Sequence, residues 1–232
     1  MNFIIESSNK TGDIVTKLPA ASKLFKQYKI DFCCGGDRPI GNVLEEKGLD
    51  KAYILQQLND LYASNNERQE IDWETAPLHV IVDQIITHYH VFTTELLAEL
   101  SPFVMKIYRV HGDTHVHLKE VYQLFSQLKA ELEPHLIDEE RDVFPHIVSY
   151  EKSGSQTDLA QAKQEIAKLE SEHEAAGALL KKLRTVTNDY QLPEEACNTY
   201  RLTYLKLEEL ESMTFEHIHL ENNILFPRLM RS

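Results

Sequence analysis

The chain has few cysteines, few turn-forming residues and no long apolar run. Only 3 of its 232 residues are cysteine, and two of these are adjacent, which excludes the disulfide framework of a small secreted protein. Eight glycines and eight prolines are too few for a turn-rich β fold. No stretch approaches the roughly 18 apolar residues of a membrane span, and the start lacks the basic flank and apolar run of a signal peptide. We therefore expect a helical protein of the cytoplasm.

Basic residues are also scarce in comparison with acidic ones. The chain has 24 lysines and arginines against 37 aspartates and glutamates, and its formal net charge is −13. Such a surface repels the phosphates of nucleic acids and of anionic lipids. We expect no nucleic-acid partner and no membrane partner, and a homodimer remains an open possibility.

The chain divides into a small part and a large part. Residues 1–64 are predicted to form a small helical domain, and residues 65–76 are polar and aperiodic, as in a linker. Within the small domain, residues 8–13 are predicted to be a turn, and helices are expected from Pro19, near 40–48 and near 50–64.

Residues 77–232 carry four long helical patterns, over about 77–108, 115–150, 158–186 and 193–230. Short connections between long helices favour antiparallel neighbours. The predicted fold class is therefore all-α: an up-down-up-down four-helix bundle preceded by a small helical domain.

Two segments far apart in the sequence repeat one motif. Each reads His-x-x-x-Glu and is followed, at the same distance, by Phe-Pro; the pairs are His135 with Glu139 and His217 with Glu221. Residues four apart share one face of a helix, so each pair offers an imidazole and a carboxylate to the same point. A bundle that joins two such faces has the donor set of a carboxylate-bridged di-metal site.

Two further histidines lie at the same level of the predicted bundle. With a rise of about 1.5 Å per residue, His90 and His217 lie about 20 Å, and His135 and His173 about 22 Å, from the same end. His111 lies about 32 Å beyond His90 on this scale, which places it near the far end. We therefore predict His90, His135, His173 and His217 as metal ligands, and treat the remaining histidines as structural or surface residues.

With these motifs, the chain resembles the hemerythrin-like di-iron family and, more closely, the iron–sulfur cluster repair proteins (repair of iron centres). The resemblance rests on Asp-Phe-Cys-Cys-Gly-Gly at 31–36, Tyr-His at 89–90, Ser-Glu-His-Glu at 171–174, and the two His-x-x-x-Glu motifs. It implies two non-haem irons with an oxo or hydroxo bridge. The implied ligands are His90, His135, Glu139, His173, His217 and Glu221, with the two glutamates bridging.

The resemblance also favours reactive thiols at Cys33 and Cys34, in a catalytic role that handles iron, sulfur or nitric oxide. From the residues alone, two small buried side chains at a helix end explain this pair equally well. A thiol beside a glycine turn is accessible to electrophiles and metals. Cys197 lies inside the fourth helical pattern, and we predict that it is a core residue.

Three functions are compatible with this reading. The first is repair of iron–sulfur clusters damaged by nitrosative or oxidative stress, through supply of iron to the damaged proteins. The second is reversible binding of O₂ or NO, and the third is enzymatic reduction of NO at the di-iron site. The thiol pair favours the first, because an oxygen carrier does not require one.

Overall fold

A computed structural model describes residues 4–64 and 71–232. These residues are mainly helical, and no β-strand is found among them apart from one isolated bridge between Lys10 and Pro39. The all-α fold class is thereby confirmed. No helix in the described part of the chain is long and apolar enough to cross a membrane. The helices belong to two compact units, Leu78–Phe215 and Met1–Pro77 with Glu216–Ser232.

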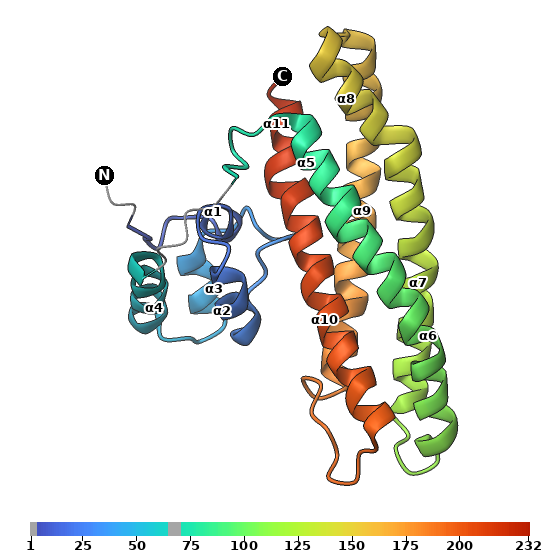
Figure 1. Cartoon of the computed structure of the whole chain (residues 1–232). Coiled ribbons are helices and arrows are strands. Elements are labelled where there is room, and N and C mark those ends of the chain that lie inside the picture. The colour runs from blue at the N-terminus through green and yellow to red at the C-terminus, as the bar shows by residue number, and fades with distance from the viewer. Residues whose placement is uncertain (1–3, 65–70) are drawn as a thin grey trace. The chain divides into compact units, whose positions relative to one another are not determined.

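The unit Leu78–Phe215 is built from four long helical segments (Figure 1). The first combines α5 (Leu78–Gln84), η1 (Ile85–His90) and α6 (Val91–His111). The second combines α7 (Leu118–Asp138), η2 (Glu139–Val143) and α8 (Phe144–Ser153). The third is α9 (Gln156–Val186), and the fourth begins with α10 (Asn198–Leu220). The connections at 112–117 and 154–155 are short and the one at 187–197 is longer, and consecutive segments run antiparallel, as the sequence predicts (Figure 1).

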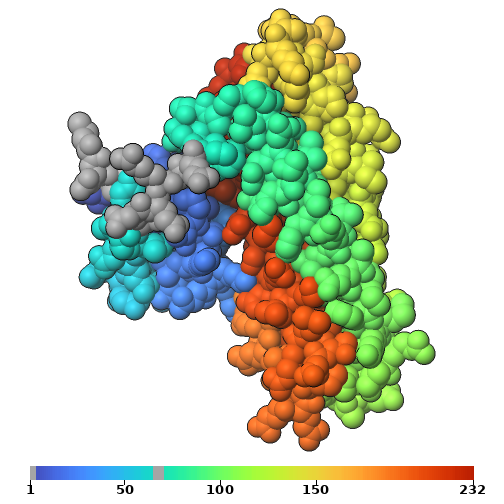
Figure 2. Space-filling model, viewed as in Figure 1, coloured from blue at the N-terminus to red at the C-terminus, as the bar shows by residue number. Residues whose placement is uncertain are grey.

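One continuous hydrophobic core holds this bundle together. It includes Leu97 of α6, Leu128 of α7, Leu180 of α9, and Tyr200 and Tyr204 of α10, each with an exposed fraction of 0% or 1%. Figure 2 shows the side chains of α6 and of the first part of α10 packed along the bundle. Burial of one large apolar side chain contributes about 1.5–3 kcal/mol. The core therefore holds the helices against one another, and with them the buried polar side chains that the same helices carry.

The other unit contains four short helices, α1 (Thr11–Lys17), α2 (Ala21–Gln27), α3 (Ile40–Glu46) and α4 (Lys51–Ser64). The last three agree with the sequence prediction within a few residues. The turn predicted at 8–13 is wrong in its second half, because α1 begins at Thr11. The hydroxyl of Thr11 donates to the carbonyl of Asp31 at 2.8 Å, so a contact distant in sequence supports this helix start.

The same unit contains the end of the chain. The last turn of α10 continues into η3 (Glu221–Leu225) and α11 (Phe226–Met230). The guanidinium of Arg228 donates to the carbonyl of Trp73 at 3.0 Å. Of the predicted linker 65–76, residues 65–70 lie outside the described residues. The predicted domain boundaries at 64 and 77 stay a prediction.

Candidate metal centre

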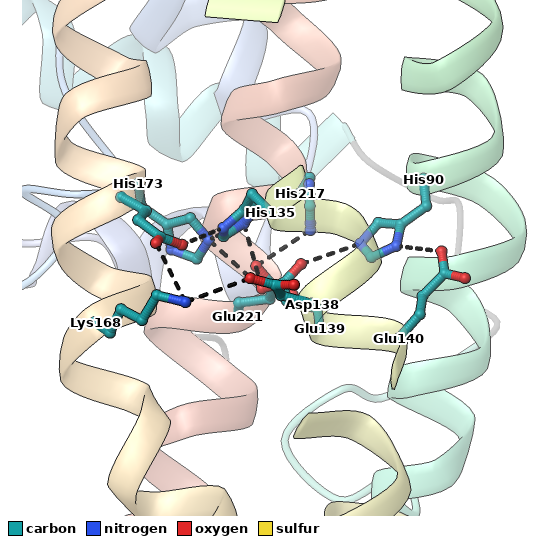
Figure 3. Close-up of polar contacts among 10 residues, drawn as sticks. His90, His135, Asp138, Glu139, Glu140, Lys168, His173, His217 and Glu221 are labelled. Atoms are coloured by element: carbon teal, nitrogen blue, oxygen red, sulfur yellow. Dashed lines mark hydrogen bonds and ion pairs between the residues drawn. The ribbon is translucent and has the colours of Figure 1, made fainter. Parts of the chain in front are cut away.

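Three histidines of the bundle converge on the carboxylate of Glu139. The Nε2 atom of His90 lies 3.3 Å from Oε2 of Glu139, and that of His135 lies 3.4 Å from Oε1. The Nε2 atom of His173 lies 3.8 Å from Oε1 of Glu139 and 3.1 Å from Nε2 of His135. All four side chains are buried, and Figure 3 shows the three rings around the carboxylate of Glu139. The two oxygens of one carboxylate thus face different histidines, as in a carboxylate that bridges two ions.

These separations fit the donor spacing of a metal site. Two ligand atoms about 2.1 Å from one ion, at angles of about 90–110°, lie about 3.0–3.4 Å apart. The observed distances of 3.1–3.8 Å between imidazole nitrogens and between nitrogen and oxygen are close to that range. Imidazole and carboxylate together suit iron, zinc and manganese. The residues present therefore fit a metal centre.

Two further carboxylates orient the histidine rings. The Nδ1 atom of His90 lies 2.8 Å from Oε1 of Glu140 (Figure 3). The Nδ1 atom of His135 lies 2.8 Å from Oε2 of Glu172. A carboxylate accepts a hydrogen bond from Nδ1–H, which leaves the lone pair of Nε2 directed towards Glu139. The side chains of Glu140 and Glu172 are 44% and 37% exposed. Helical periodicity gives neither glutamate a role, because each one reaches its histidine from a different helical segment.

A pocket borders the outer side of this arrangement. Its volume is about 530 Å³, and Val82, Ile86, Glu140 and Phe144 are among its lining residues. Glu140 therefore touches solvent on one side and the ring of His90 on the other. The pocket offers small molecules an approach to the orienting carboxylate.

The second His-x-x-x-Glu motif lies on the final helix. The Nε2 atom of His217, near the end of α10, lies 3.1 Å from Oε2 of Glu221, the first residue of η3. Both side chains are buried, with exposed fractions of 2% and 0%. All six residues predicted as ligands belong to groups of histidines and glutamates that could hold a metal ion.

A π-helical turn occurs at each motif. His90 ends η1, Glu139 begins η2 and Glu221 begins η3. A π turn contains one extra residue, and such turns are frequent at functional sites. The second and third turns stand directly before Phe-Pro, where Pro145 and Pro227 have no N–H to donate and exclude the carbonyl four residues earlier. The repeated Phe-Pro is therefore the sequence signal of a π turn, which helical periodicity alone did not reveal.

The thiol loop, residues 31–36, is held by Asp31. One carboxylate oxygen of Asp31 accepts from the backbone N–H of Cys33 and of Gly35, each at 3.1 Å. Cys33 is buried and Cys34 is partly buried, and their sulfurs lie 3.9 Å apart without a disulfide. Two effects raise the pKa of the Cys33 thiol well above its usual value: the larger is the contact with the Cys34 side chain, and the second is burial. Both effects disfavour the thiolate form of Cys33.

The histidines excluded as ligands have other partners. His111 and His115 stack at the end of α6 with ring centroids 5.9 Å apart, and His117 lies 2.9 Å from the hydroxyl of Tyr204. His111 also lies 3.4 Å from the sulfur of Cys197. The prediction that Cys197 is a core residue is wrong: it is exposed, because α10 begins at Asn198 rather than near 193.

Two family models match the chain. The Hemerythrin HHE cation binding domain matches residues 82–229, which include every predicted metal ligand. A Domain of Unknown function (DUF542) matches residues 7–62, which include both cysteines of the thiol loop. The two models together cover both parts of the chain that the sequence predicts.

Curated relatives match the chain over nearly their whole length. The iron–sulfur cluster repair protein ScdA of Staphylococcus haemolyticus is 33% identical over 225 residues, which cover 97% of this chain and 99% of that protein. The iron–sulfur cluster repair protein YtfE of Citrobacter koseri is 38% identical over 219 residues, covering 94% and 95%. A probable iron–sulfur cluster repair protein of Haemophilus influenzae is 34% identical over 224 residues, covering 97% of both chains.

Proposed function

Because the chain belongs to the family of iron–sulfur cluster repair proteins with a hemerythrin HHE domain, we propose that it restores iron–sulfur clusters damaged by nitrosative or oxidative stress by supplying iron. Its partners would then be the damaged iron–sulfur proteins and the small gases NO and O₂. The cytoplasmic location and the homodimer remain predictions.

The proposed cofactor is a pair of non-haem irons with an oxo or hydroxo bridge. One ion would be held by His90 and His217 and the other by His135 and His173, with Glu139 and Glu221 shared between them. The observation that carries the proposal is that the two carboxylate oxygens of Glu139 face different histidines. Oε2 faces His90, whereas Oε1 faces His135 and His173. When bound, such an iron pair supplies redox chemistry and exchangeable ferrous or ferric ions.

The protein's own residues explain why this centre would exchange iron. Glu140 and Glu172 orient two ligand rings from the partly exposed side of the bundle, and the pocket beside Glu140 allows water and small chelators to approach. Protonation or displacement of an orienting carboxylate weakens a metal–imidazole bond without removal of the ligand. A centre built in this way suits a donor better than a carrier that must hold its iron permanently.

The test is transfer of iron to an iron–sulfur enzyme that NO has inactivated. The iron-loaded protein is expected to restore enzyme activity while its own iron content falls in proportion. The metal-free protein serves as the control, and equal recovery with it would contradict iron supply. A reversible gas carrier or an NO reductase would instead keep its iron when challenged with a chelator.

A further inference from the structure

The final helix carries two sets of side chains on opposite faces. His217 and Glu221 are four residues apart and form one set, and His219 and Asn223 form the other. A step of two residues turns about 200° around a helix, so the sets face in opposite directions. The first set consists of proposed metal ligands. The second set contacts the thiol loop, within the unit that contains both segments.

His219 and Asn223 bind the backbone of the thiol loop through three contacts, and His219 makes a fourth contact with Thr16 of α1. The amide of Asn223 donates to the carbonyl of Cys33 at 3.0 Å and to that of Phe32 at 3.3 Å. The Nδ1 atom of His219 lies 3.2 Å from the carbonyl of Phe32, and its Nε2 atom lies 3.3 Å from the hydroxyl of Thr16. A carbonyl only accepts, so the proton of His219 resides on Nδ1.

The fit around Asn223 is close. The N–H of Gly12 donates to the carbonyl of Gly36 at 2.8 Å, which brings α1 against the end of the thiol loop. A Cβ atom on Gly12 would lie 2.5 Å from Oδ1 of Asn223, and one on Gly36 would lie 2.3 Å from it. Both positions therefore need glycine, because any side chain would push the Asn223 amide away from the loop.

The loop in turn covers one of the thiols. Cys33 is 3% exposed, and the ring of Phe32 packs edge-on against the ring of His219 at a centroid distance of 5.7 Å. An adduct on the Cys33 sulfur does not fit unless the loop moves. Movement of the loop breaks its hydrogen bonds to His219 and Asn223. His219 lies between the proposed ligands His217 and Glu221 in the sequence, and Asn223 follows Glu221 by two residues.

We propose that Asn223 and His219 are positioning residues that couple the thiol loop to the ligand helix, so that modification of Cys33 loosens the iron held by His217 and Glu221. The part of this proposal that concerns iron release rests on the proposed function, in which His217 and Glu221 hold iron. The coupling passes through backbone carbonyls of the loop, so replacement of cysteine by serine preserves it, whereas a bulky adduct disrupts it. Thiol chemistry and iron release would thereby occur together.

The first measurement is the rate of Cys33 alkylation by N-ethylmaleimide in the full-length protein, with Cys34→Ser and Cys197→Ser present so that only Cys33 can react. Asn223→Ala is expected to raise this rate about tenfold, the factor that corresponds to the loss of about 1.4 kcal/mol from hydrogen bonds. Asn222→Ala is the matched control, because it removes the same residue type from the same π turn. Gly12→Ala places a methyl group against the Asn223 amide and is expected to raise the alkylation rate as Asn223→Ala does. An unchanged rate in both variants would overturn the contact's role.

The second measurement is iron release to a chelator, before and after alkylation of the thiol loop. In the otherwise unchanged protein, alkylation is expected to accelerate release severalfold. In Asn223→Ala, release is expected to be fast already and independent of alkylation, which a merely structural role would not produce. If alkylation does not change the rate of iron release in the protein with Asn223 intact, the proposed coupling is overturned. A protein that binds no iron would refute the proposed function, while the alkylation rates would still test the loop contact.

Discussion

The Nδ1 atom of His90 lies 2.8 Å from a carboxylate oxygen of Glu140. Through this contact a partly exposed residue fixes the ring of a buried one, and the Nε2 atom of His90 is directed at Glu139. His135 and Glu172 repeat the relationship at the same distance on another pair of helical segments. Two independent histidine–carboxylate pairs aimed at one carboxylate are difficult to explain by packing alone, and they are the usual surroundings of bound metal.

Glu140→Gln is therefore expected to lower iron affinity by about 10–100-fold without abolishing binding, because an amide orients the ring but attracts its proton less. The measurement is competition for iron against a chelator of known affinity. Glu133→Gln is the control, since Glu133 is a half-exposed residue of the same helical segment that pairs with Lys129. Equal effects of the two substitutions would mean that Glu140 acts only through surface charge.

Removal of a proposed ligand is expected to have a larger effect. Glu139→Leu and Glu221→Leu should each lose most of the bound iron, because a leucine offers no oxygen to either ion. His111→Leu should keep it, since His111 contacts Cys197 and His115 at the end of α6. Iron content per chain after purification is the measurement. Comparable losses from all three variants would contradict the placement of the metal centre.

The thiol pair is expected to serve repair rather than iron retention. With Cys33→Ser and Cys34→Ser together, bound iron and the oxo-bridged absorption should remain largely intact, because Asn223 and His219 bind backbone carbonyls of this loop rather than its sulfurs. Recovery of an NO-inactivated iron–sulfur enzyme should nevertheless fall. Both quantities are measured on the same variant. Loss of iron would make the cysteines part of the metal centre, and full repair would reduce them to packing residues.

The buried ion pair between Arg184 of α9 and Glu211 of α10 is expected to stabilise the bundle. The guanidinium of Arg184 donates through Nε to Glu211 at 2.8 Å and makes a second contact through its terminal nitrogen, and Glu211 is 1% exposed. Arg184→Met should lower the free energy of unfolding by about 3–5 kcal/mol, because it leaves a buried charge without its main partner.

Urea unfolding of the metal-free protein measures this cost, and addition of Glu211→Leu to Arg184→Met should recover most of it. Lys206→Met is the control, since Lys206 pairs with a half-exposed Glu99 and should cost less than about 1 kcal/mol. A similar loss for both single variants would show that burial of the pair is unimportant.

The sequence was sufficient to locate the bundle because apolar periodicity is a property of each helix by itself. His90, His135 and His173 could be placed at one level by helical rise alone, and the structure brings them to Glu139. Helical rise and periodicity did not predict the π turns, although Pro145 and Pro227 follow two of them directly. Each π turn adds a single residue to its helix, a shift too small to be recognised from apolar periodicity.

Contacts distant in sequence account for the remaining errors. The helix α1 starts at Thr11 because the carbonyls of Asp31 and Gly36 accept hydrogen bonds from Thr11 and Gly12, which no local pattern of residues 8–13 reveals. Cys197 is exposed because the last connection of the bundle extends to residue 197. Glu172 orients His135 from a different helix, and only the folded chain shows that pairing.

The measurement that tests the central claim most directly is the metal content of the full-length protein produced with iron available. Four imidazoles with two shared carboxylates satisfy two ions better than one. Elemental analysis should therefore find about two irons per chain, and the Glu139→Leu variant should lose them. One zinc and no iron per chain would contradict a di-iron centre, and with it the proposal that this protein supplies iron.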